Sequence, residues 1–221
     1  MSDEIPPWLA ERDAKSGKTR KSRRLPEGCG CCIWLFAGAC VWGLVSLYGV
    51  NAHVDELRQN ESRNMSRKIS NAVEQFYADY SRLPLPSGPP PQGGDRDTDT
   101  STTHGFAAIL LAKEAESGER QNTHRTNYLE GIWPARGKTT DESPWRNGAI
   151  NDPLTGACGI VDSYGKPFRI RLDTNGDQQV ANPDPDQAAE GRLMLPKRVI
   201  VWGAGKDGKW ETWDDNPKSW E

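Results

Sequence analysis

The sequence predicts an α+β protein in which a long N-terminal helix packs on a small antiparallel sheet. An uncharged apolar run, Cys31–Val50, leads into a segment that lacks proline and glycine as far as Tyr80. Two later stretches, Phe168–Leu172 and Arg198–Trp202, have the apolar content and length of short strands. A long helix and two or three short strands bury a common core best in an α+β domain.

The apolar run predicts a membrane anchor. Residues 1–30 are polar and contain a basic run from Lys15 to Arg24, which predicts a disordered basic tail. Residues 31–50 match the length of a spanning helix, because about 20 helical residues cross the roughly 30 Å of a bilayer core. The positive-inside rule keeps the tail in the cytoplasm. We therefore expect a single-pass protein of the cytoplasmic (inner) membrane whose C-terminal part is periplasmic.

Two other interpretations of this run stay open. A basic region followed by an apolar one also fits a cleaved secretory signal, although the run is long and no small-x-small cut site follows it. The residues before Cys40 weakly resemble a lipoprotein cut site, but the usual leucine three residues before the cysteine is missing.

Residues 51–83 are predicted to continue the membrane helix. Apolar residues recur there at spacings of four, four, three and four, which places them on one helix face: Met65, Ile69, Val73, Phe76 and Tyr80. Pro84 and Pro86 are expected to end the helix.

Residues 84–221 are predicted to form the extracytoplasmic domain. A loop rich in proline, glycine and aspartate comes first, followed by a short helix over Gly105–Ala115 that Thr102 or Thr103 is expected to cap. Tyr128, Leu129 and Ile132 form a buried patch in this prediction, and residues 134–157 form mostly loop. Cys158 is the one cysteine of this part of the sequence, so it can form no disulfide within the domain.

Two acidic loops are candidate cation sites. In the first, Asp173, Asn175 and Asp177 have the one-three-five spacing of a calcium loop, and Asp184 falls at the twelfth place. Gln178 stands where such a loop needs glycine, so both calcium binding and a plain solvated turn stay open.

The second acidic loop lies near the C-terminus and is the stronger candidate. Its expected ligands surround a glycine-rich turn: Asp207, Asp214, Asp215 and Asn216. Neighbouring carboxylates repel one another, and a divalent ion would remove that repulsion and order the loop. Hard oxygen ligands favour Ca²⁺. Three tryptophans are expected to pack the loop on the domain: Trp210, Trp213 and Trp220.

Other functional classes find little support. The net charge of −3 carries no nucleic-acid signature. The start of a P-loop pattern at Gly203–Lys209 is followed by Trp210 instead of Ser or Thr, and too few residues remain for its helix. The histidines His53, His104 and His124 lack metal spacing, and no nucleophile motif accompanies them. We expect a protein that is not an enzyme and has no small-molecule substrate.

Four segments in order resemble a known family: "ISNAVEQFYADYSRLP" (Ile69–Pro84), "NYLEG" (Asn127–Gly131), "VDSYGKPFRIRLD" (Val161–Asp173) and "VIVWGAGKDGKWETWDDN" (Val199–Asn216). They are similar to segments of the major pseudopilins of type II secretion, a type IV pilin-like family. The resemblance implies a pilin-like fold, calcium in the last loop, and a structural role in a secretion or pilus-like assembly. It implies other pseudopilin-like subunits, secretion machinery and membrane lipid as partners. The alternative is a non-polymerising calcium-binding envelope domain on the same anchor. An exported hydrolase is a third, less favoured interpretation.

The N-terminus departs from the family pattern. Pilin precursors carry a glycine at the cut site and a glutamate shortly after it, whereas this sequence has no acidic residue from Gly28 to Val54. A processed, positively charged N-terminus would lack its partner in an apolar surrounding. We therefore expect the basic tail to stay attached.

Overall fold

The computed structural model describes residues 30–85, 94–115, 120–135, 146–152 and 156–221, with side chains from Val50 onward. Residues 1–29 and, apart from Val50, the side chains of the predicted membrane segment lie outside this description. In the part that is described, no helix combines the length and apolarity needed to cross a bilayer. Val50–Glu221 forms one compact unit, and the site lies within it.

Helix α2 (Gly30–Tyr80) is 51 residues long and provides one wall of this unit from Val50 onward. The predicted apolar face is confirmed, because Met65, Ile69, Val73 and Phe76 are all buried. Tyr80 packs at the edge of the same core, and the helix ends before Pro84 as expected.

The main sheet has three antiparallel strands in the order β1 (Arg96–Asp99), β4 (Arg169–Leu172), β7 (Val199–Trp202). The class prediction of a helix with small antiparallel sheets is therefore confirmed, and so are the two predicted strands. Arg171 in the central strand pairs with Ile200 on one side and Asp97 on the other.

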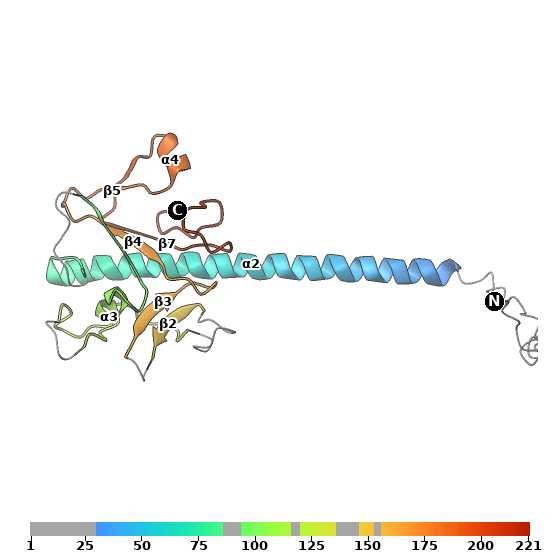
Figure 1. Cartoon of the computed structure of the whole chain (residues 1–221), viewed down its shortest axis with the longest axis horizontal. Coiled ribbons are helices and arrows are strands. Elements are labelled where there is room, and N and C mark those ends of the chain that lie inside the picture. Colours follow the sequence, from blue (N-terminus) through green and yellow to red (C-terminus); the bar gives the residue numbers. More distant parts are fainter. Residues whose placement is uncertain (1–29, 86–93, 116–119, 136–145, 153–155) are drawn as a thin grey trace, which may run out of the picture. The chain divides into compact units, whose positions relative to one another are not determined.

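Strand β7 separates two cores because its side chains alternate between the two faces of the sheet. Val199 and Val201 join the core that α2, α3 and β4 share. Figure 1 labels β4, β7 and α3 around the same stretch of α2. Ile200 and Trp202 face a second core, whose other members are Val180, Leu195, Trp210, Trp213 and Trp220. The expected packing of the C-terminal tryptophans on the domain is thus confirmed. The patch at Tyr128, Leu129 and Ile132 is confirmed as part of the first core.

The remaining elements are short. They are α3 (Phe106–Leu110), the hairpin β2 (Gly148–Asn151) with β3 (Cys158–Val161), the pair β5 (Val180–Ala181) with β6 (Met194–Leu195), and α4 (Pro185–Ala189).

Three local expectations are corrected. The helix expected over Gly105–Ala115 covers only Phe106–Leu110. Its N-cap is Gly105 with φ 70° and no side-chain cap, so neither Thr102 nor Thr103 caps it. The stretches expected to be loop contain β1 and β2.

Candidate functional site

The C-terminal loop, defined here as Gly203–Asn216, leaves the end of β7 and returns beside the same strand. The backbone N–H of Gly203 donates to the carbonyl of Pro217 at 3.0 Å, and that of Ser219 donates to Val201 at 2.9 Å. Because both ends are fixed on the buried strand, the loop must close within a short span. This closure brings Asp215 and Asn216, on the returning arm, against Gly205 on the outgoing arm.

Gly205 is the point where the two arms meet. A Cβ atom at this residue would lie 2.7 Å from Oδ2 of Asp215 and 2.8 Å from Oδ1 of Asn216. Gly205 also has a φ of +63°, which glycine adopts without strain. Both side-chain oxygens therefore crowd against one glycine, and no larger residue fits between them.

Asn216 supplies the observation that favours a ligand. The residue is 3% exposed, and its Nδ2 donates to the carbonyl of Trp210 at 3.1 Å. Its Oδ1 is buried and has no hydrogen-bond partner among the residues that the structure describes. A buried acceptor without a donor is costly, and a cation beside it would satisfy it.

Asp215 also accepts hydrogen bonds from the turn that follows Gly205. Its Oδ2 accepts from the backbone N–H of Lys206 at 2.7 Å and from that of Asp207 at 3.3 Å. The structure therefore brings two of the four expected ligands, Asp215 and Asn216, together at Gly205.

The other two expected ligands are placed differently. Asp207 uses Oδ2 to accept from the Thr212 hydroxyl at 2.6 Å and Oδ1 to accept from the Lys209 N–H at 2.8 Å. The Thr212 hydrogen bond, followed by that of Lys209, lowers the pKa of Asp207 and keeps it ionised. Asp214 is exposed. Neither side chain is brought to Gly205 as Asp215 is.

The donor set fits a hard cation only with help from the backbone. Over the described ranges, no three His, Cys, Asp or Glu side chains converge into a group able to hold a metal. Calcium takes six to eight oxygens and accepts main-chain carbonyls among them. Asp215 and the orphaned Asn216 oxygen would therefore contribute two donors, with carbonyl oxygens supplying others.

The first acidic loop has its side chains engaged already. Asp173 is 4% exposed, and its two oxygens accept from the backbone N–H groups of Gly176 at 2.7 Å and Gln178 at 2.8 Å. Asp184 caps α4 and accepts from Lys218 Nζ at 2.8 Å. These contacts favour a self-capped turn over a cation site.

A serine, a histidine and an aspartate meet on the turn after β1, but in the wrong arrangement for nucleophilic catalysis. Ser101 Oγ lies 2.9 Å and Asp99 Oδ1 lies 3.0 Å from the same nitrogen, His104 Nδ1. A catalytic triad needs its nucleophile and its acid on opposite ring nitrogens. These contacts build a turn.

Asp162 is a buried carboxylate that inspection of the sequence did not single out. Its Oδ1 accepts from the backbone N–H groups of Tyr164 at 2.9 Å and Lys166 at 2.8 Å. Its Oδ2 faces Gly203 at the start of the C-terminal loop and has no hydrogen bond of good geometry. Burial raises the pKa from its ordinary 3.8 to about 6, while backbone N–H groups, including that of Ala204, act in the opposite direction. In the sequence, the residues "DSYG" from Asp162 to Gly165 have the composition of a turn, which is consistent with this role.

Asp162 should make stability depend on pH. A carboxyl whose pKa is higher in the folded state binds its proton more tightly there, so its contribution is favourable in acid and is lost as pH rises from about 4 to about 6. A rise from 3.8 to about 6 corresponds to about 3 kcal/mol. We expect Asp162→Asn to lack this pH-dependent loss, and urea unfolding from pH 4 to pH 7 measures it. Parallel curves for the two proteins would contradict the assignment.

Comparison with protein-family models, curated proteins and solved structures found no match to the chain.

Proposed function

We propose that this chain is a membrane-anchored, non-enzymatic subunit or accessory of a pseudopilin-like assembly, of the kind that type II secretion uses. Residues 31–50 anchor it in the inner membrane, the domain lies in the periplasm, and Ca²⁺ stabilises the C-terminal loop. Its partners are other pseudopilin-like subunits, secretion machinery and membrane lipid.

An apolar stripe on α2 is the observation that carries the proposal. Val50, Val54 and Leu57 are 61%, 37% and 51% exposed, although all three are apolar. Their spacing of four and three residues places them on one face of the helix. An exposed apolar face indicates a surface that another molecule covers. A second copy of this helix has the matching apolar stripe, so self-association is the simplest way to bury it.

The C-terminal loop supports the calcium part of the proposal. Asp215 and Asn216 converge at Gly205, and Asn216 Oδ1 is a buried acceptor without a donor. When bound, Ca²⁺ would neutralise the Asp215 carboxylate and satisfy this oxygen. The residues that hold the ion would then also hold the two arms of the C-terminal loop together.

Disulfide crosslinking in membranes tests the assembly. The five native cysteines are first replaced by alanine, and one new cysteine is placed at Val54 or, as the control, at the exposed Glu190. We expect Val54→Cys to give a crosslinked dimer and Glu190→Cys to give little. Absence of crosslinking at Val54 in membrane-bound protein would favour the alternative, a non-polymerising calcium-binding envelope domain.

The intact mass of the unmodified chain, purified from membranes with its native cysteines, reports on the N-terminus. We expect the full chain, since no acidic residue from Gly28 to Val54 is present to pair with a processed N-terminal amine. A chain that starts at Cys29 or Cys31 would instead indicate an ordinary processed subunit.

A further inference from the structure

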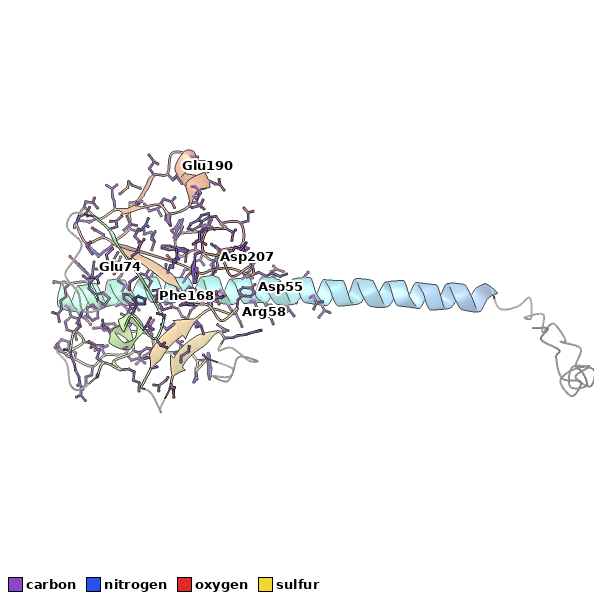
Figure 2. All side chains as sticks on the ribbon, viewed as in Figure 1. Asp55, Arg58, Glu74, Phe168, Glu190 and Asp207 are labelled. Atoms are coloured by element: carbon purple, nitrogen blue, oxygen red, sulfur yellow. The ribbon has the colours of Figure 1, made fainter. Side chains whose placement is uncertain are left out.

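The C-terminal loop contacts α2 through an ion pair with an acidic residue of the helix. Lys206 Nζ forms an ion pair with Asp55 Oδ2, 151 residues away in the sequence. Tyr164, from the turn that Asp162 caps, donates its hydroxyl to the backbone carbonyl of Asp55 at 3.5 Å. Figure 2 labels Asp55 on α2 and Asp207 in the loop at this junction. The loop and the turn before β4 thus hold the same helical turn.

The contact with α2 is linked to the candidate calcium ligands through one residue. The backbone N–H of Lys206 donates to Asp215 Oδ2 at 2.7 Å, while its side chain reaches Asp55. The position of the Lys206 backbone therefore depends on the orientation of the Asp215 carboxylate. A cation that fixes Asp215 also fixes the origin of the Lys206 side chain.

Asp55 has a second partner within α2, on its other carboxylate oxygen. Arg58, one turn further along α2, lies 3.7 Å from Asp55 Oδ1. When Lys206 moves away, Asp55 keeps this pair within the helix. Loss of the Lys206 contact therefore leaves Asp55 with one cation and costs little free energy, as for other exposed ion pairs.

Asp55 lies on the same turns of α2 as the apolar stripe, but on a different face of the helix. Its sequence neighbour Val54 is part of the stripe, and Leu57 follows two residues later. A contact that holds Asp55 in place also restrains the turns of α2 that carry Val54 and Leu57.

We propose that the C-terminal loop is a cation-controlled latch on α2, in which Ca²⁺ bound beside Asp215 positions Lys206 to hold Asp55 and so orders the apolar stripe. The inference rests on the proposed calcium loop and adds a regulatory link from that loop to the assembly face. Because coupling between two sites is reciprocal, covering the stripe should also tighten calcium binding.

Hydrogen exchange of the full chain, purified in detergent with calcium or with chelator, tests the latch. Exposed ion pairs contribute little, so we expect calcium to slow exchange of the α2 amides near Asp55 by about two- to fivefold. Lys206→Met should remove this effect on α2 while leaving the calcium-dependent protection of the loop. Lys209→Met removes the same charge from an exposed position of the same loop and should keep both effects.

The outcomes separate the latch from the calcium site. Protection of the loop without protection of α2 overturns the latch and leaves the calcium site standing. Protection of α2 that persists in Lys206→Met also overturns the latch. If calcium protects neither segment, both the latch and the calcium site are wrong.

Discussion

Replacing Lys218 by methionine is expected to destabilise the domain by about 3 kcal/mol, near the cost of breaking a buried ion pair. The side chains of Lys218 and Asp184 are 8% and 2% exposed, and their charged atoms lie 2.8 Å apart. Methionine fills a similar volume but leaves the Asp184 carboxylate without its cation. Asp184 retains only the backbone N–H groups of Asp186 and Gln187 as donors.

The sign of the pH dependence follows from both partners. Despite burial, the Lys218 hydrogen bond holds the pKa of Asp184 below its ordinary value, so its contribution is lost as pH falls through the folded-state pKa. The pKa of Lys218 is raised against the effect of burial by hydrogen bonds to Asp184 and Glu221, so its contribution is lost only at alkaline pH. The loss of stability caused by Lys218→Met should therefore be complete at pH 7 and smaller in strong acid.

Urea unfolding at pH 7 and pH 3 measures this deficit. Lys197→Met is the matched control, because Lys197 is exposed and its replacement should cost little stability. The double variant Asp184→Asn with Lys218→Met should recover part of the loss, since it removes the orphaned charge. Equal stability of Lys218→Met and wild type at pH 7 would show that the pair is not buried in solution.

The helix and the two apolar strands were predictable because burial imposes a period on the sequence. The spacing from Met65 to Phe76 matches one buried face of α2, and the apolar composition of Val199–Trp202 matches a strand buried on both faces. In each of these segments, local sequence and tertiary packing favour the same structure.

The missed strands have no such period. Arg96–Asp99 reads Arg-Asp-Thr-Asp and contains no apolar residue, yet it forms the edge strand β1. Its position is set by backbone pairing with β4 and by the Arg171 guanidinium, which donates to both oxygens of Asp97 at 2.6 and 2.8 Å. Polar edge strands of this kind are fixed by their neighbours and leave little trace in their own sequence.

The candidate site was predictable in part. The acidic loop with Asp215 and Asn216 stands out in the sequence, whereas their convergence on Gly205 depends on how Pro217 returns along β7. Lys206 and Asp55 lie 151 residues apart in the sequence, so no local sequence pattern predicts their contact.

Calcium binding at the C-terminal loop is expected to have a large effect on the stability of the folded domain. A ligand that binds only the folded state stabilises it by about 2.7 kcal/mol when its free concentration is about 100 times the dissociation constant. For a domain of this size that shift raises the melting temperature by about 5–10 °C. Asp215→Asn should abolish the shift, because it removes the charged donor at Gly205. Asp177→Asn, an equal change in the first acidic loop, should leave it nearly unchanged.

Thermal unfolding of residues 51–221, with calcium and with chelator, tests directly whether the C-terminal loop binds calcium. Each variant is compared with its own chelated form, so that any general destabilisation cancels. We expect a higher midpoint with calcium for the wild type and for Asp177→Asn, and no difference for Asp215→Asn. Equal midpoints for the wild type, or a shift that Asp177→Asn removes and Asp215→Asn keeps, would contradict it.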